Sequence, residues 1–247
     1  MKPILYQQNF VIPYQQLDPF GHLSPTAALQ MAQSLATGHA EACNAGYNIT
    51  RAAGCAWVIT RAQYQFFNMP EVNSQLVGTT WLGVGRHGFV PRYYTLQTAQ
   101  GDLVMCGSGE WMLIDLSTGH TVSPQLSAQF EIPSNPQQKA DHIPTPRRLR
   151  PKTYTQSIHR PVLYSDTDTN GHLNNCYYAA WVMDLLPKQL LAHTRLCTLK
   201  MNYVSQAMWE EEITLQYNID NLNVQVCGSV GDKCVFLAEA TLQEVQP

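Results

Sequence analysis

The sequence predicts an α+β fold built from two copies of one unit. Three observations lead to this prediction: an internal repeat, apolar residues at helical spacing, and segments rich in β-branched and aromatic residues. Residues 14–23 (YQQLDPFGHL) and residues 164–173 (YSDTDTNGHL) share five identical positions, each offset by 150. Each copy precedes a helix-like stretch and then β-rich sequence. One long helix followed by an antiparallel sheet, twice, is an α+β plan.

The first helix is predicted to begin at Ser24-Pro25, because serine caps helix N-termini and proline suits the first helical position. We expect it to end before Gly46. Its apolar face consists of Ala28, Leu29, Met31, Ala32, Leu35 and Ala36. In the second copy we expect Asn174 or Asn175 to cap a helix that ends near Pro187. The apolar stripe of that helix consists of Tyr177, Tyr178, Trp181, Val182 and Leu185.

Eight segments are predicted to be strands because of their β-branched and aromatic content. In the first half they cover residues 55–67, 74–84, 88–99 and 103–115, and we expect an antiparallel meander. In the second half they cover residues 196–205, 211–220, 223–231 and 234–245. Turn signals lie at Gln100-Gly101-Asp102, Asp220-Asn221 and Gly231-Asp232.

A linker is predicted between the halves, giving three regions: residues 1–132, the linker 133–152, and residues 153–247. The linker has five prolines and little apolar content. Its basic residues are either a solvated segment or a docking strip for an acidic partner. They are Lys139, Arg147, Arg148, Arg150 and Lys152.

Composition excludes several classes of function. The net charge of the 247 residues is −3 and only 13% are charged, so we expect no nucleic acid partner. No apolar stretch reaches the ~18–20 residues of a spanning helix, and the start of the chain lacks the apolar core of a signal peptide. We therefore expect a soluble, cytoplasmic protein with no membrane span. The seven cysteines are dispersed without C-x-x-C spacing, which argues against a disulfide framework and a zinc site.

Chemistry is concentrated in the second copy of the repeat. No G-x-S-x-G, G-x-x-x-x-G-K-[ST] or H-E-x-x-H pattern occurs. Instead Asp168, Asn170 and His172 alternate before a helix, so their side chains could converge on one face of an extended loop. A carboxylate, an amide and an imidazole, with free N–H groups near Asn174 as oxyanion donors, would suit a hydrolytic step. The alternative is that the two polar side chains form Asx-turns and the histidine is buried.

Two neighbouring interpretations are less favoured. In the first copy Phe20 replaces the amide and Pro19 stiffens the loop, so Asp18 and His22 are expected to be structural. Residues 166–171 open like a calcium loop, but the twelfth position is Tyr177, where a bidentate Glu is needed. No metal site is therefore expected.

The stretch YSDTDTNGHLNNCYYAAWVMDLLP (residues 164–187) resembles the signature of acyl-acyl-carrier-protein thioesterases. Residues 17–42, 54–61 and 107–124 resemble the opening helix, the tryptophan strand and the closing strand of the same family. The resemblance implies a tandem (double) hotdog fold, with two long helices each wrapped by an antiparallel β-sheet. The two halves would pack as a pseudo-dimer, and a homodimer is a further assembly that stays open.

The family resemblance also implies an activity: hydrolysis of the thioester between a fatty acyl chain and acyl carrier protein, without metal or organic cofactor. It implies that Asp168, Asn170 and His172 are catalytic. Many members carry a Glu or Cys where this chain has Gln206 and Ala207, so Asp168 would act as base or nucleophile. Gln206 could orient water or hold His172.

The sequence leaves the roles of several residues open. A shift in register would bring Glu210 into the place of Gln206. Trp57 and Arg61 are candidate substrate-binding residues, with packing as the default interpretation, and Cys176 is expected to be a buried thiol. An acyl-CoA thioesterase of the same fold and a non-catalytic acyl-binding protein are the alternative functions.

Overall fold

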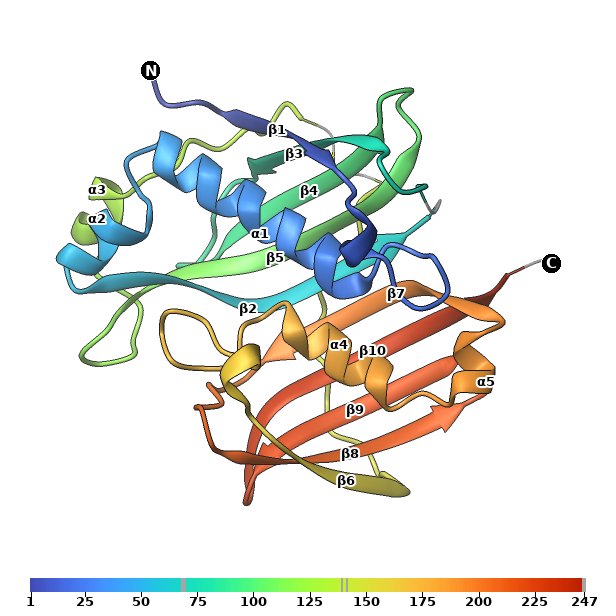
Figure 1. The fold of residues 1–247 in the computed structure, drawn as a ribbon. Coiled ribbons are helices and arrows are strands. Elements are labelled where there is room, and N and C mark those ends of the chain that lie inside the picture. The colour runs from blue at the N-terminus through green and yellow to red at the C-terminus, as the bar shows by residue number, and fades with distance from the viewer. Residues whose placement is uncertain (68–69, 139, 141, 246–247) are drawn as a thin grey trace.

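The fold is a ten-stranded antiparallel sheet that carries both halves of the chain (Figure 1). In this computed structural model, residues 1–67, 70–138, 140 and 142–245 are described. The first-half strands are β1 (Leu5–Val11), β2 (Cys55–Phe66), β3 (Gln75–Leu82), β4 (Val90–Thr98) and β5 (Leu103–Asp115). The second-half strands are β6 (Gln156–Pro161), β7 (Thr194–Tyr203), β8 (Glu212–Asp220), β9 (Asn223–Val230) and β10 (Lys233–Glu244). The helices are α1 (Pro25–Ala42), α2 (Tyr47–Ala52), α3 (Pro124–Gln129), α4 (Tyr177–Asp184) and α5 (Lys188–Leu191).

The strand order repeats the internal symmetry of the sequence. It is β1-β3-β4-β5-β2 in the first half and β7-β10-β9-β8-β6 in the second, so corresponding strands lie at equal distances from the centre. The halves join where β2 pairs with β7, from Arg61 opposite Asn202 to Gln65 opposite Thr198. All eight predicted strands are present. The predicted meander holds for β3, β4 and β5, but β2 pairs with β5 and not with β3.

Two strands, β1 and β6, were not predicted. They lie at the two edges of the sheet, and most β6 residues are exposed to solvent. An edge strand with solvent on one side needs few apolar residues, so it leaves little signal in the sequence.

Helix α1 agrees with its prediction. The Ser24 hydroxyl accepts a hydrogen bond from the Ala27 N–H at 3.2 Å, and Pro25 is the first helical residue. The helix ends at Ala42, and Gly46 then serves as the N-cap of the short helix α2, which was not predicted.

Helix α4 is shorter than predicted, because it has eight residues against eighteen in α1. Its start is delayed to Tyr177 since the Asn174 N–H bonds to the Asp166 carbonyl at 2.9 Å, which holds residue 174 in the loop. It ends before Pro187, whose ring cannot continue a helix. The expected pair of long helices is therefore one long helix and one short one, followed by the four-residue α5.

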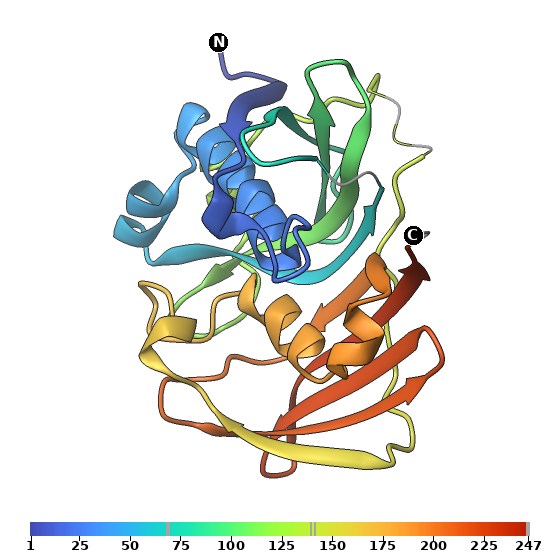
Figure 2. The same ribbon diagram turned by 45° about the vertical axis from the view of Figure 1, so that its right-hand side comes forward.

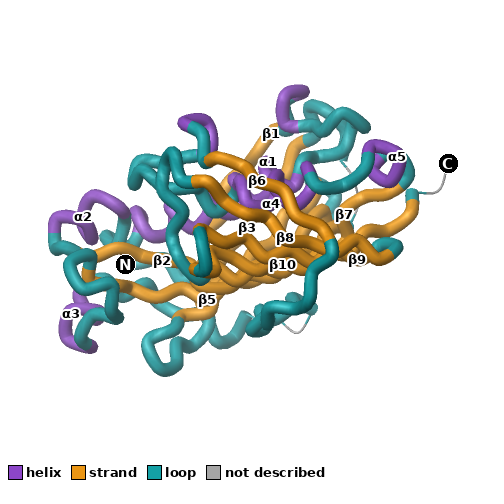
Figure 3. Tube along the Cα trace, turned by 90° about the horizontal axis from the view of Figure 1, so that it is seen from below, coloured by secondary structure: helices purple, strands orange, loops and turns teal. Residues whose placement is uncertain are grey.

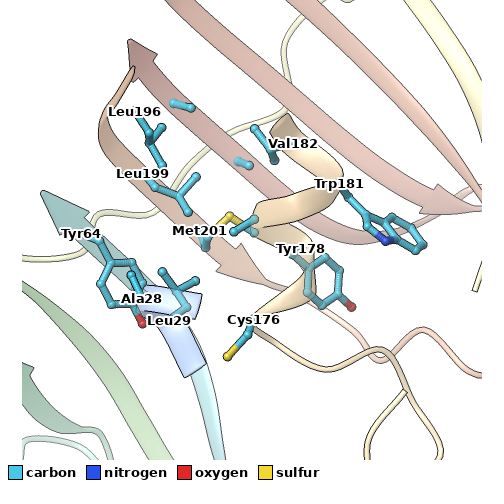
Figure 4. Packing of buried hydrophobic residues seen from close by; sticks show 14 of the residues in the cluster. Ala28, Leu29, Tyr64, Cys176, Tyr178, Trp181, Val182, Leu196, Leu199 and Met201 are labelled. Atoms are coloured by element: carbon cyan, nitrogen blue, oxygen red, sulfur yellow. The ribbon is translucent and has the colours of Figure 1, made fainter. Parts of the chain in front are cut away.

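Helices α1 and α4 lie against the same face of the sheet and contact each other (Figures 1 and 2). Tyr178 and Trp181 of α4 and Leu199 and Met201 of β7 belong to the main cluster of buried residues (Figure 4). From β6, the Arg160 guanidinium lies 4.5 Å from the Trp181 ring centroid and forms an ion pair with Asp184.

The linker runs along the opposite face of the sheet (Figure 3). Ile143 packs in a cluster with Trp81 and Cys106. The buried Asn202 side chain accepts the Leu149 N–H at 2.7 Å and donates to the Arg147 carbonyl at 3.0 Å. The linker is thus held on the sheet by specific contacts. Among the described residues, no helix has both the length and the apolar character needed to span a membrane.

A buried histidine connects the N-terminal segment to α1. His39 is fully buried, with Nε2 2.9 Å from the Pro3 carbonyl and Nδ1 3.1 Å from the Arg92 guanidinium. Since arginine only donates, Nδ1 accepts and the ring is neutral with its proton on Nε2. Burial, together with the Arg92 charge, lowers the pKa of His39 to about 4.

We predict that Trp181→Ala destabilises the protein by about 3–5 kcal/mol, because a fully buried indole is lost. Trp209→Ala is the matched control. Its side chain is 53% exposed, so the cost should stay below about 1 kcal/mol. Urea unfolding of both variants measures the difference, and equal destabilisation would contradict this account of α4 packing.

We also predict that stability falls as the pH drops from about 6.5 toward about 4, because the unfolded chain then binds a proton that folded His39 excludes. The full contribution is on the order of 3 kcal/mol. Urea unfolding over this pH range should show a smaller loss for His39→Gln than for the wild type. Identical pH dependence in both proteins would refute the assignment.

Candidate functional site

The second motif forms a closed turn that brings the Asp168 and His172 side chains close together. The Asp168 N–H donates to the His172 carbonyl at 3.1 Å, and the Gly171 N–H donates to the Asp168 carbonyl at 2.9 Å. Gly171 has a φ of 75°, a conformation that favours glycine. The Asn170 N–H donates to Asp168 Oδ1 at 2.8 Å, which is the Asx-turn contact. Asp168 Oδ1 and His172 Nδ1 lie 3.8 Å apart, each side chain 22% exposed.

The segment after β7 lies beside this turn. The Leu173 N–H donates to the Ala207 carbonyl at 2.8 Å, and the Trp209 N–H donates to the Gly171 carbonyl at 3.2 Å. The Gln206 side chain is exposed, and no hydrogen bond between it and His172 occurs among the described residues. The backbone of the residues that follow Gln206 contacts the motif, and the described contacts assign no such role to Gln206 itself.

Glu210 and Glu211 have different surroundings. Glu210 is exposed with a φ of 69°, and its N–H donates to the Val162 carbonyl at 3.0 Å. The Glu211 carboxylate accepts the Met208 N–H at 2.7 Å. Burial raises the pKa of Tyr178 well above its usual range, and the charges of Asp168 and Glu211 add to this shift. Asp168 and Glu211 thus both act on the Tyr178 hydroxyl, whereas Glu210, the alternative that the sequence left open, is exposed.

Asn170 is contacted from the other half of the chain. The Arg51 guanidinium, on α2, donates to Asn170 Oδ1 at 3.2 Å, and it lies 5.6 Å from the Tyr47 ring centroid. No sequence signal pointed to Arg51, because it lies 119 positions from Asn170 and matches no motif.

Three of the N–H groups near Asn174 that were expected to serve as oxyanion donors are already engaged in hydrogen bonds. The Asn174 N–H is bound to the Asp166 carbonyl, and the Cys176 N–H is bound to Asn174 Oδ1 at 2.9 Å. The Tyr177 N–H donates to the Asn174 carbonyl at 3.0 Å. These N–H groups are engaged in closing the loop and starting α4.

The first motif has the same turn. Asp18 Oδ1 accepts the N–H groups of Phe20 and His22, each at 2.9 Å. Asp18 Oδ2 lies 3.8 Å from His22 Nδ1, the separation that is also found in the second motif. Among the three alternating positions of the motif, the two loops differ at one, where Phe20 stands opposite Asn170.

Cys176 is a buried thiol. Its sulfur lies 3.0 Å from Gln33 Oε1 of α1, and burial, together with the Asp168 charge, raises its pKa to about 12. A thiol with this pKa supplies little thiolate at neutral pH, so Cys176 is unsuited as a nucleophile.

Trp57 and Arg61 lie on β2. Trp57 packs against a separate buried cluster that includes Leu82 and Leu113, and its indole N–H is buried without a hydrogen-bond partner. Arg61 Nε is 3.0 Å from Glu110 Oε2. Among the described residues, neither side chain makes a hydrogen bond, ion pair or ring contact with the Asp168 loop.

The remaining predicted residues lie outside the loop. Arg147, Arg148 and Arg150 are exposed, and Lys152 forms an ion pair with Glu239 at 2.9 Å. Lys139 lies outside the described residues. In the described part of the chain, no group of three or more potential metal-ligating side chains converges. Asp166, the first position of the calcium-like pattern, is buried and accepts the Leu163 N–H at 3.1 Å.

Two family sequence models match the chain: the acyl-ACP thioesterase N-terminal domain over residues 3–128 and the C-terminal domain over residues 150–233. A curated relative from Cuphea viscosissima, acyl-[acyl-carrier-protein] hydrolase FATB2, chloroplastic, is 22% identical over 212 residues, covering 81% of this chain and 52% of the relative. Palmitoyl-acyl carrier protein thioesterase, chloroplastic, from Cuphea hookeriana is 22% identical over 215 residues, covering 81% and 51%. The chain therefore spans about half the length of these curated relatives.

Solved structures share the fold over nearly the whole chain. An acyl-ACP thioesterase from Bacteroides thetaiotaomicron superposes with a TM-score of 0.85 at 19% identity, covering 97% of this chain and 98% of that one. A 12:0-ACP thioesterase from Umbellularia californica superposes with a TM-score of 0.84 at 16% identity, covering 99% of each chain.

We predict that N-ethylmaleimide at neutral pH modifies Cys234 well before Cys176. Cys234 is partly exposed, and the neighbouring Cys227 thiol lowers its pKa. Cys176 is buried with a raised pKa. Peptide mass spectrometry over time measures the order, and early labelling of Cys176 in the folded protein would mean that its thiol is more accessible and more acidic than described.

Proposed function

The chain belongs to the acyl-ACP thioesterase family, and we propose that it hydrolyses fatty acyl-acyl-carrier-protein to free fatty acid and carrier protein. The observation that carries the proposal is the closed turn that holds the Asp168 carboxylate 3.8 Å from His172 Nδ1 and carries Asn170 between these two residues. We extend the proposal to the architecture, a tandem hotdog with regions 1–132, 133–152 and 153–247. The dispersed free cysteines support a cytoplasmic location.

In the proposed reaction, Asp168 acts as the general base. Its Oδ1 is bound by the Asn170 N–H, which leaves Oδ2 to accept a proton from water as the water oxygen attacks the thioester carbonyl. The Asn170 amide stabilises the oxyanion that forms. The C–S bond then breaks, and His172, 3.8 Å from Asp168, passes the proton to the departing thiolate. Gln206 is proposed to orient the water from the neighbouring segment, and Trp57 and Arg61 to contact substrate.

Two alternatives differ in what they predict. An acyl-CoA thioesterase would use the same groups on a different carrier, so kcat/KM on matched carrier-protein and CoA thioesters separates the two. A non-catalytic acyl-binding protein is favoured by Gln206, which stands where a carboxylate would act as base. That alternative predicts thioester binding without turnover.

We predict that Asp168→Asn lowers kcat by about 100- to 10,000-fold, because the amide cannot take a proton from water. Stability should change by less than about 1 kcal/mol, since Asn at this position still accepts the Asn170 N–H. The measurement is release of free acid from acyl-carrier-protein thioesters of graded chain length, with urea unfolding of both proteins. Full activity in the variant would remove Asp168 from the mechanism, and a folded wild type that releases no acid would remove the proposed function.

A further inference from the structure

The Arg51 side chain, in the first half of the chain, contacts Asn170 of the second motif. We propose that Arg51 is a positioning residue that fixes the orientation of the Asn170 amide, so that Nδ2 faces the thioester carbonyl. This inference rests on the proposed function, and it assigns a role to a residue outside the motif.

The chemistry of the two groups determines the orientation of the amide. A guanidinium has only donors, so the atom of Asn170 that it contacts at 3.2 Å must be the acceptor, Oδ1. The amide is planar, and its other terminal atom, Nδ2, carries the two N–H donors. With Oδ1 held by Arg51 and the backbone N–H held by Asp168 Oδ1, the free end of Asn170 is its donor end.

A donor is needed at this place because the backbone supplies few. The N–H groups of Asn174, Cys176 and Tyr177 are all used within the loop and the start of α4. The Asn170 amide is an exposed side-chain donor in the turn that also carries Asp168 and His172. The positive charge of Arg51, bound to the far end of the amide, polarises its N–H groups and favours negative charge at the oxyanion.

Arg51 is itself held by its surroundings. The Glu41 carboxylate of α1 accepts the Tyr47 N–H at 3.1 Å, which ties the start of α2 to α1. Thr50 is buried, and its hydroxyl donates to the Gly46 carbonyl at 3.1 Å. The guanidinium then lies against the Tyr47 ring. An anchored helix and a ring contact reduce the conformational freedom that Arg51 would otherwise lose on contacting Asn170.

The first loop provides an internal comparison. It has the same Asp–His separation of 3.8 Å, but Phe20 has no amide to orient. Aspartate and histidine are thus brought together by the turn alone, in both loops. The Asn170–Arg51 pair is present in the second loop and has no counterpart at Phe20.

The test compares Arg51→Ala, Arg51→Lys and Asn170→Ala with the wild type in the free-acid assay. We expect Arg51→Ala to lower kcat about 10- to 100-fold, the range for a hydrogen bond from a charged donor, with KM within about twofold. Arg51→Lys should retain more activity than Arg51→Ala, and added guanidinium should partly restore kcat of Arg51→Ala only. Arg51→Ala combined with Asn170→Ala should be no slower than Asn170→Ala alone.

Arg86→Ala is the matched control. It removes an exposed arginine between β3 and β4 whose backbone N–H bonds to the Phe89 carbonyl, and it should leave kcat unchanged. Wild-type kcat in Arg51→Ala, or multiplicative losses in the double variant, would overturn the inference while the proposed function stands. A raised KM with unchanged kcat would also overturn it, because Arg51 would then bind substrate directly. An inactive wild type would overturn both.

Discussion

The antiparallel pairing of β2 with β7 fixes how the two halves of this protein sit together, and both the core and the candidate site depend on it. Backbone hydrogen bonds from Arg61–Asn202 to Gln65–Thr198 turn two five-stranded sheets into one. A slip of one residue would move buried side chains of β2, such as Tyr64, to the opposite face. The same pairing brings α1 against α4 and lets Arg51 reach Asn170 across 119 positions of sequence.

The two repeated loops show which features follow from the turn geometry that they share. In both loops a glycine adopts a positive φ and the histidine lies 3.8 Å from the aspartate carboxylate, which accepts two backbone N–H groups in Asp18 and one in Asp168. Proximity of Asp and His therefore follows from the turn geometry and carries no functional information alone. In our proposal, the functional information lies in the amide of Asn170 and in the Arg51 guanidinium that contacts it.

The sequence predicted the parts of the fold that depend on local patterns. Ser24-Pro25 marks the start of α1 through a cap, and β-branched and aromatic runs mark eight strands, because these signals act over a few residues. The edge strands β1 and β6 were missed because an exposed strand needs few apolar side chains. The length of α4, the occupied Asn174 N–H and the role of Arg51 could not be predicted, since each depends on contacts between distant segments.

The most direct test of this account converts the second loop to the pattern of the first. Asn170→Phe places at this position the residue that the first loop already accommodates as Phe20. A crystal structure of the variant should retain an Asp168–His172 separation near 3.8 Å, while release of free acid from acyl-carrier-protein falls to the level of Asp168→Asn. Turnover near the wild-type rate, with the turn intact, would contradict the claim that the oriented amide makes the second loop catalytic.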